Sequence, residues 1–468
     1  MSLFIVGLDN TILNVALPSI RSDLDASMSE LQWTIDAYTL VLASLLMLAG
    51  STADRIGRRR VFQTGLVLFA LGSLLCGVAP GLDWLIAFRV IQAIGGSMLN
   101  PVAMSIITNT FTEPRERARA IGVWGAVVGV SMALGPIVGG ALVDSLGWRS
   151  VFWINLPVAI AAIVLTALFV PESKAAHARR ADPVGQALVF TFLLSLTYAI
   201  IEGPEAGWTS PLIIGLFALS AGCLAGLSGY EPRRAEPLID LRFFRSAPFT
   251  GATVIGVCAF AAMSGFLFLN TLYLQDARDF SPIEAGLRTL PMALMTVVCA
   301  PISGRLVGRI GPRVPLVVAG IAIAASAGLL TGLDDHTSTA RMVAAYTLFG
   351  IGFGLVNAPI TNTAVSGMPR AQAGVAAAIA STSRQVGQSF GVAVVGTTMA
   401  SVLAAPSAGG LAAATHTGWW IVLGCGAAVA CLGMLTTGRW ALRTAERTGA
   451  ELMPQTPPLE LETTDVRR

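Results

Sequence analysis

Charged side chains are scarce in this sequence, and the motifs of soluble enzymes are missing. Only 12% of the 468 residues are Asp, Glu, Lys or Arg, whereas a typical soluble domain has about 25%. So few charges could not cover a water-soluble fold of this length, which excludes a cytosolic enzyme, a disordered chain and a small secreted scaffold. A Walker loop, an HExxH motif and a CxxC pair are all absent. We therefore expect no enzyme, no ATP-driven pump, no metal site and no cofactor. The energy for any transport would come from an ion gradient or from the concentration gradient of the substrate itself.

Long apolar runs are what the sequence has instead. Hydrophobic residues make up 54% of it, and fourteen runs are long enough to cross about 30 Å of hydrocarbon as helices of roughly 20 residues. The first run begins at Met1 and carries Asp9 in its middle, so we expect a spanning helix rather than a cleaved signal peptide. The even number places both termini on one side of the membrane. The runs are 2–20, 33–53, 61–80, 83–108, 120–142, 150–170, 184–202, 211–229, 248–272, 284–304, 315–333, 341–365, 373–402 and 418–437.

Basic residues are distributed unevenly between the connections. Of the 30 Lys and Arg residues, 23 lie in the connections after even-numbered runs and in the tail, and four lie in the connections on the other side. Because basic loops are retained in the cytoplasm, we expect both termini to be cytoplasmic, in the inner (cytoplasmic) membrane of a bacterium. The other three, Arg89, Arg288 and Arg384, lie within runs, where a charge is costly and marks a functional candidate.

Two short patterns repeat at almost the same spacing. Arg55-Ile56-Gly57 recurs as Arg309-Ile310-Gly311 after 254 residues, and Asn100 recurs as Asn357 after 257 residues. Such a repeat predicts two homologous halves. A six-helix half accounts for about 190 to 200 residues, so the excess fits two helices inserted between the halves.

The expected architecture is therefore all-α, with two pseudo-symmetric six-helix bundles and two inserted central helices, fourteen in all. We expect the tail to be polar and disordered. The predicted segments are an N-terminal bundle over 1–182, two extra helices over 183–229, a cytoplasmic linker over 230–247, a C-terminal bundle over 248–437 and a cytoplasmic tail over 438–468.

Three charged residues inside the runs are candidates for proton coupling. Asp9 lies mid-membrane, where an unpaired carboxylate must be protonated, paired or lined by water; alternatively it only hydrogen-bonds a neighbouring helix. Asp36 lies about one turn inside the second run and is either a second protonatable group or a rim carboxylate facing water. Arg89 must face a cavity or a carboxylate such as Asp9, unless it extends to the outer interface.

Two further patterns suggest moving or closely packed helices. The connection after the second run has small residues and charges that could form a latch between helices, although plain retention of arginines in the cytoplasm explains the arginines alone. It contains Gly50, Asp54, Arg55, Gly57, Arg58 and Arg59. The fifth run places glycines largely along one stripe with a proline kink, a pattern that also serves plain packing. These residues are Gly129, Gly135, Pro136, Gly139 and Gly140.

Taken together and in order, these segments resemble the signature motifs of the major facilitator superfamily, in particular its fourteen-helix drug/proton antiporter branch. The connection from Gly50 to Arg59 matches the family's cytoplasmic gating loop, and we use this name for it below. The fourth run matches a second motif through Arg89, Gly95 and Pro101. The glycines of the fifth run match a third. The first run from Asp9 to Pro18 and the segment Trp148–Pro157 match two more. In the second half, Gly308 stands where the gating loop has Asp54, so the resemblance places the latch mostly in the first half.

The resemblance implies a proton-coupled antiporter that exports amphipathic drugs, or related toxic or self-made compounds, by alternating access. Its partners would be protons, a small amphipathic substrate and the lipid bilayer, without nucleic acid, and we expect a monomer. A facilitator or an exporter of a specific metabolite without proton antiport is the alternative, and a non-transporting membrane protein is a second one. Polar residues expected toward the transport cavity are Asn14, Gln92, Asn100, Asn357 and Arg384; Arg384 could instead pair with an acid.

Overall fold

The computed structural model describes residues 1–111, 113–174, 182–234, 237–334, 336–366, 368, 373–403 and 411–452. Within these ranges the chain consists of helices joined by short connections, and no strand is found. A helix satisfies its own backbone hydrogen bonds, which the interior of a bilayer requires. The predicted all-α class is therefore confirmed for the part of the chain that the structure describes.

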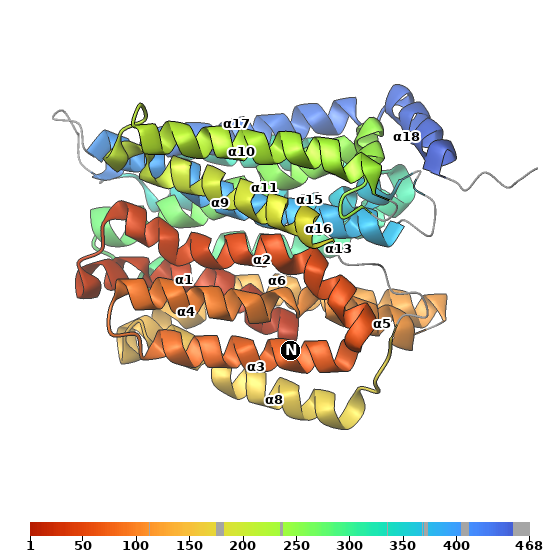
Figure 1. The fold of residues 1–468 in the computed structure, drawn as a ribbon. Helices are drawn as coiled ribbons and strands as arrows, with labels where there is room; N and C mark the ends of the chain where they lie inside the picture. Colours follow the sequence, from red (N-terminus) through yellow and green to blue (C-terminus); the bar gives the residue numbers. More distant parts are fainter. Residues whose placement is uncertain are drawn as a thin grey trace, which may run out of the picture.

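The first half of the chain forms one layer of the molecule (Figure 1). The predicted fourth run over 83–108 corresponds to one candidate span, Leu82–Thr110, although the helix within it is interrupted just before Pro101, which cannot donate a backbone hydrogen bond. The helices of this half are α1 (Ser2–Leu24), α2 (Met28–Ile56), α3 (Arg58–Gly77), α4 (Leu82–Ser97), α5 (Asn100–Thr110), α6 (Pro114–Leu146), α7 (Ser150–Trp153) and α8 (Asn155–Phe169).

The rest of the chain forms a second layer above the first in this view (Figure 1). The predicted linker over 230–247 contains two short 3-10 turns, η1 (Glu231–Arg233) and η2 (Leu241–Arg245), and α11 is extended by one π-helical turn, η3 (Tyr273–Ala277). The helices are α9 (Pro183–Ala206), α10 (Pro211–Tyr230), α11 (Ala247–Leu272), α12 (Pro282–Arg288), α13 (Leu290–Ile310), α14 (Arg313–Leu330), α15 (Thr339–Val365), α16 (Ala373–Leu403), α17 (Leu411–Leu435) and α18 (Arg439–Leu452).

Twelve helical segments among the described residues are long and apolar enough to span a membrane. The helices α1 and α6 are not among them. Both are long, with 23 and 33 residues, but part of each lies outside the residues whose side chains the structure describes, and the apolar stretch described in α6 is only Leu134–Leu146.

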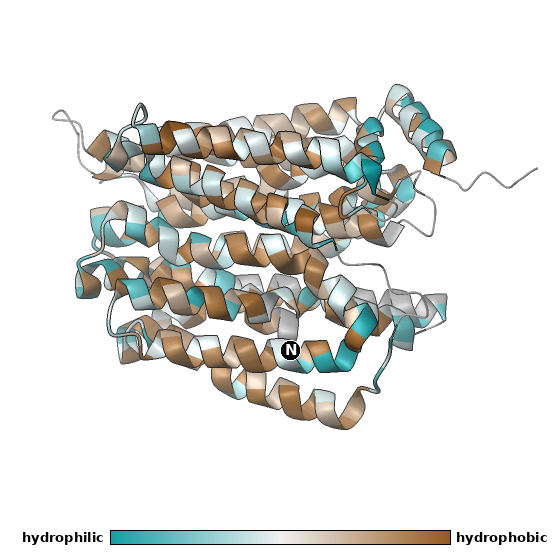
Figure 2. Cartoon of the chain, in the orientation of Figure 1, coloured by the Kyte–Doolittle hydropathy of each residue, from teal (hydrophilic) through white to brown (hydrophobic). Residues whose placement is uncertain are grey.

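Large apolar side chains cover the outside of both layers. Leu168 and Phe169 of α8 are 71% and 74% exposed, and Leu212 and Ile214 of α10 are also exposed. Hydrophobic residues run along the lengths of the helices, while hydrophilic residues gather toward their ends (Figure 2). An apolar surface of this extent is unfavourable in water, so the protein is a multi-span membrane protein.

The two repeated Arg-Ile-Gly patterns occupy equivalent turns. Gly57 joins α2 to α3 and Gly311 joins α13 to α14, and both have a positive φ, of 132° and 81°. Such angles favour glycine. The two turns lie at the same end of the bundle as the arginines of η2, and we call this end the arginine-rich end.

The helices α9 and α10 lie at one side of the second layer, and α9 reaches the boundary with the first layer. α9 packs against both α2 and α16. At the arginine-rich end the Gln186 side-chain amide donates a hydrogen bond to the Ser44 carbonyl. At the opposite end the Trp33 indole donates to Glu202 (2.7 Å) and the Ser29 hydroxyl donates to Glu205 (3.1 Å). The two extra helices therefore cover one side of the boundary between the halves.

The expectation that the tail is disordered was wrong for its first part. Residues Arg439–Leu452 form α18, whose Ala441 and Ala445 are buried against α11 and η2. Apolar positions three to four residues apart give the helix one face that can pack in this way. The rest of the predicted tail, 453–468, lies outside the described residues.

Candidate functional site

Asp9 and Arg89 form a buried ion pair in the first layer. Arg89 Nη1 lies 2.6 Å from Asp9 Oδ2, and each side chain is only 1% exposed. α1 contributes the acid and α4 the base, each from within its helix. Removing two charges from water is expensive unless their remaining hydrogen-bonding groups also find partners, so the surroundings of this pair decide whether it is stable.

Three polar side chains provide those partners. Gln92, one turn after Arg89 on α4, donates to Asp9 Oδ1 (2.8 Å) and accepts from Arg89 Nη1 (2.6 Å). Asn155, at the start of α8, also donates to Asp9 Oδ1 (3.0 Å). The Ser73 hydroxyl of α3 accepts from both amides, at 2.7 and 3.2 Å. The carboxylate of Asp9 thus receives three hydrogen bonds.

Arg89 is held from two further directions. Its Nε donates to the Thr34 carbonyl of α2 (3.2 Å), and its guanidinium lies 4.2 Å from the centre of the Tyr38 ring. A cation over an aromatic face is stabilised, more so where water is excluded. Arg89 therefore contacts α1, α2 and α4 at once, and protonation of Asp9 would remove its only carboxylate partner among the described residues.

Asp36 forms a second, separate acidic site on α2. Its exposed fraction is zero, so the alternative of a rim carboxylate facing water was wrong. The reason is that α2 begins at Met28, five residues before the predicted span, with a capping box between Ser27 and Glu30. The Thr39 hydroxyl donates to Asp36 Oδ1 (3.1 Å), whereas Oδ2 has no hydrogen-bond partner among the described residues. Ser389 of α16 lies next to this carboxylate, at the boundary between the halves.

The gating loop is ordered mainly by a residue that the sequence reasoning missed. Arg58 Nε donates to Asp54 Oδ1 (3.0 Å) within the loop. Glu172, just after α8, accepts from the backbone N–H groups of Arg59 (3.1 Å) and Arg60 (3.3 Å), which are the first turn of α3. A carboxylate at a helix N-terminus satisfies free N–H groups and the helix dipole. No sequence pattern links Glu172 to a loop that lies more than 100 residues earlier.

Glycines of the loop have unequal roles. A side chain at Gly57 would collide with the Glu172 carboxylate, about 2.7 Å away, and would also be strained by the positive φ. A Cβ at Gly50 would make only ordinary contact with Pro101 (3.8 Å). Arg55 also makes an interaction in this region. The close helix approach expected at Gly50 is therefore not required sterically.

The glycines of α6 lie against two different partners. Gly135 faces Thr11 and Gly139 faces Ile12, so that α6 packs closely on α1 beside Asp9. Gly140 faces the backbone of Pro282 and Ile283 at the start of α12, while Pro136 faces Gly286 of that helix. The surroundings of Gly129 lie outside what the structure describes. One stripe of small residues thus packs α6 against both halves.

Hydrogen bonds between the halves gather at the end opposite the arginine-rich end. Among the described residues, Arg21 pairs with Asp276 (3.4 Å), Gln275 donates to the Val15 carbonyl (3.0 Å) and the Ile283 N–H donates to Asp144 (3.3 Å). At the arginine-rich end, by contrast, Thr361 and Asn362 of α15 are exposed. Because the contacts between the halves gather at the other end, the structure is closed there.

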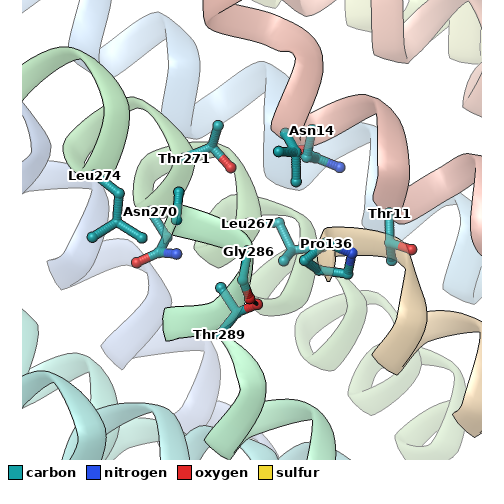
Figure 3. Close-up of a pocket in the computed structure, with 11 residues that line it drawn as sticks. Thr11, Asn14, Pro136, Leu267, Asn270, Thr271, Leu274, Gly286 and Thr289 are labelled. Atoms are coloured by element: carbon teal, nitrogen blue, oxygen red, sulfur yellow. Dashed lines mark hydrogen bonds between the residues drawn. The ribbon is translucent and has the colours of Figure 1, made fainter. Parts of the chain in front are cut away.

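A small polar gap lies just inside this closed end, between α1, α6, α11 and α12 (Figure 3). Its free space is about 10 Å³, which is room for about one water molecule. Asn14 and Thr11 face it from the first half and Asn270, Thr271 and Thr289 from the second (Figure 3). The gap is too small for a substrate in this conformation.

The other predicted cavity residues are spread over both halves. Gln92 is buried in the Asp9 network and does not face a cavity. Asn100 begins α5, and its Oδ1 is buried without a partner among the described residues. Asn357 accepts from Thr361 through its backbone carbonyl (3.3 Å). Arg384 donates to the Thr361 hydroxyl (2.5 Å) and has no acid partner among the described residues. Arg288, the third arginine found within a run, stacks over the Phe280 ring.

Most of the chain matches a known protein family. Residues 1–392 match the Major Facilitator Superfamily. Among similar proteins, multidrug resistance protein Stp of Mycobacterium tuberculosis is 38% identical over 406 residues, which cover 86% of this chain and 75% of that protein. The tetracenomycin C resistance and export protein of Streptomyces glaucescens is 37% identical over 402 residues, or 86% and 74% of the two chains. Puromycin resistance protein pur8 of Streptomyces alboniger is 37% identical over 86% of this chain and 80% of its own.

Solved structures share the fold at low identity. A bacterial homologue of the human lysosomal transporter Spinster, in an inward-facing and occupied conformation, has a TM-score of 0.64 with 16% identity and 96% coverage of both chains. A D-xylose–proton symporter has a TM-score of 0.65 with 14% identity, covering 95% of this chain and 94% of its own.

Proposed function

The chain belongs to the major facilitator superfamily, and we propose that it is a proton-coupled antiporter that exports small amphipathic compounds of the drug or antibiotic class across the cytoplasmic membrane. Membership places it among transporters rather than enzymes, and the relatives described above carry names of resistance and export proteins. The finer parts of the proposal are the proton coupling, the direction and the substrate class. Proton coupling has its support in the residues, whereas the direction and the substrate class rest on the names of the relatives.

The proposed topology has fourteen spanning helices with both termini in the cytoplasm. α1 and α6 join the twelve apolar segments, because they pack against each other and against spanning helices of both halves, and α1 carries Asp9 into contact with α4. The 23 basic residues in one set of connections then lie in the cytoplasm, as positive-inside retention requires. The arginine-rich end becomes the cytoplasmic end, and the closed end is periplasmic.

The proposed mechanism is alternating access between the two halves. The Arg21–Asp276 contact and the α6–α12 contact hold the periplasmic end shut in this conformation. Opening the periplasmic end requires these contacts to separate while the gating loop and its surroundings close the cytoplasmic end. A proton and a substrate that favour different states would then be exchanged.

The single observation that carries proton coupling is the Asp9–Arg89 pair. A proton on Asp9 would neutralise the carboxylate, and Arg89, which also contacts α2 through Thr34 and Tyr38, would lose its counter-charge. Because α2 carries the gating loop and borders α16, a change at Arg89 has a physical route to the boundary between the halves. A buried charge left without its partner costs several kcal/mol, about 3–5, enough to bias two conformations.

The test is Asp9→Asn in everted membrane vesicles. The variant keeps the size of the side chain but cannot bind and release a proton, so substrate-dependent proton flux should be lost while the protein remains folded. Asp83→Asn, at an exposed acid in the first turn of α4, is the matched control and should transport like the parent. Full proton flux in Asp9→Asn would show that Asp9 is not the coupling group. A growth-inhibition panel in an exporter-deficient host identifies the exported compounds.

A further inference from the structure

Two carboxylates that the transport mechanism does not use meet where the extra helices reach the arginine-rich end. Asp182 is the N-cap of α9 and is 4% exposed, and Glu231 follows α10 and has an exposed fraction of zero. Glu231 Oε1 lies 2.6 Å and Asp182 Oδ2 3.0 Å from the point where a Cβ on Gly185 would stand. The two oxygens are therefore no farther apart than the sum of these short distances.

Only part of the charge of this pair is compensated. Asp182 Oδ1 accepts from the Gly185 N–H (2.9 Å) and the Tyr230 hydroxyl (3.1 Å), and Arg234 lies 3.9 Å from Asp182 Oδ2. Asp182 Oδ2 and both carboxylate oxygens of Glu231 have no hydrogen bond of good geometry among the described residues, although the backbone N–H groups of Leu238 and Ile239 lie near the Glu231 carboxylate. Among the described residues, one arginine thus faces two acids that meet beside Gly185.

A second positive charge is needed for this arrangement. Two buried carboxylates at such a distance cannot both ionise without strong repulsion, and a shared proton removes it. A divalent cation would require six or more oxygen ligands, whereas this place offers two carboxylates and an arginine that repels a metal. Among the residues that the structure describes, the charged and titratable groups facing Glu231 are Asp182 from α9, Tyr230 from α10 and Arg234 from the linker.

We propose that Asp182 and Glu231 bind one proton between them, and that this proton sets how firmly α9 is attached to α2. Gln186 lies one turn after Asp182 and donates to the Ser44 carbonyl of α2. Loss of the proton makes the two carboxylates repel each other in the first turn of α9 and loosens that contact. On the topology proposed above, the proton comes from the cytoplasm, so α2 responds to cytoplasmic pH at a place separate from Asp9.

Infrared titration of the purified full chain in nanodiscs tests the binding directly and needs no transport. The parent should show a protonated-carboxyl band that disappears as the pH rises and that is absent from Glu231→Gln. Asp182→Asn should shift the midpoint of this band to lower pH by about one unit or more, because the like charge is gone. Glu451→Gln, at an exposed acid paired with Arg245, is the matched control and should keep the band. Identical spectra for the parent and Glu231→Gln would overturn the proposal, as would loss of the band on adding magnesium at constant pH.

A fluorescent label on the α2 end tests the coupling to α9. Ile56 is 52% exposed, so Ile56→Cys can be labelled in a Cys431→Ser background, which removes the exposed native thiol. The label should report a pH-dependent change in the parent that is lost in Glu231→Gln and in Gln186→Leu, while Gln186→Leu keeps the infrared band. An unchanged fluorescence response in both variants would overturn the link to α2. Because neither readout involves transport, failure here leaves the antiporter proposal to its own test.

Discussion

Arg21 of α1 and Asp276 of η3 form an ion pair across the boundary between the two halves, with 3.4 Å between Nη1 and Oδ2. Their side chains are 40% and 24% exposed, and pairs of this kind contribute at most about 1 kcal/mol. A contact this weak can break and re-form during a transport cycle. It is therefore suited to bias the closed end, which is periplasmic on the proposed topology, without locking it.

Reversing the charge of Arg21 should open the periplasmic end. In Arg21→Asp, two acids face each other across the boundary, and Thr271→Cys, introduced in the small polar gap, should react severalfold faster with an impermeant thiol reagent added from outside. The double variant Arg21→Asp with Asp276→Arg should restore the slow reaction. If the double variant reacts as fast as the single one, the pair does not hold this end closed.

Removing the Gln92 amide should impair coupling without removing either charge. In Gln92→Leu the Asp9 carboxylate loses one of its three hydrogen-bond donors and Arg89 Nη1 loses an acceptor, so the buried pair is held less firmly. We expect export to fall about tenfold, as a loss of about 1.4 kcal/mol implies. Export is measured as substrate efflux. Gln385→Leu, on α16 away from this network, should export like the parent, and unchanged efflux in Gln92→Leu would count against the network.

Adding one methyl group to α6 should separate it from α1. A Cβ at Gly135 would overlap the Thr11 side chain, and overpacking of this kind costs about 1–3 kcal/mol. Gly135→Ala should therefore lower the thermal unfolding temperature in detergent and reduce export. Gly308→Ala, where nothing lies within 4 Å, is the matched control and should be neutral or slightly stabilising. Equal stability of the two variants would contradict the close α1–α6 packing.

Removing the Glu172 carboxylate should loosen the first turn of α3. The Arg59 and Arg60 N–H groups lose their acceptor in Glu172→Ala, and loss of a helix cap costs about 1 kcal/mol. We expect faster hydrogen exchange in peptides from Arg58 to Phe62, with a smaller effect in Glu172→Gln, which keeps one acceptor oxygen. Lys174→Ala, two residues away and exposed, should exchange like the parent; if Glu172→Ala does so too, the cap is not needed.

The sequence was most informative where one residue type is costly in the membrane. Asp9 and Arg89 stand out because charges are rare in apolar runs, and the structure brings them together. Helix positions followed from the length of the apolar runs. The start of α2 was missed because the Ser27–Glu30 capping box adds a polar turn that hydropathy excludes.

Contacts that depend on tertiary packing were outside the reach of sequence patterns. Ser73, Asn155 and Glu172 are ordinary polar residues in their own segments, and only the fold places them at Asp9 or at the gating loop. The same holds for Asp182 and Glu231. Asp182 precedes α9 and Glu231 follows α10, so they are about 50 residues apart in the sequence, and only the folding of α9 against α10 brings them together. A sequence can show that a charge needs a partner, but not which distant neutral side chain provides it.

The position of α9 makes the molecule asymmetric toward lipid. Two seams run between the halves, and α9 lies along the one between α2 and α16, held by Gln186 at one end and by Glu202 and Glu205 at the other. The second seam lies where α6 meets α13. On the proposed topology α9 lies between the first seam and the acyl chains, so a compound dissolved in the bilayer would reach α2 and α16 there only by passing α9.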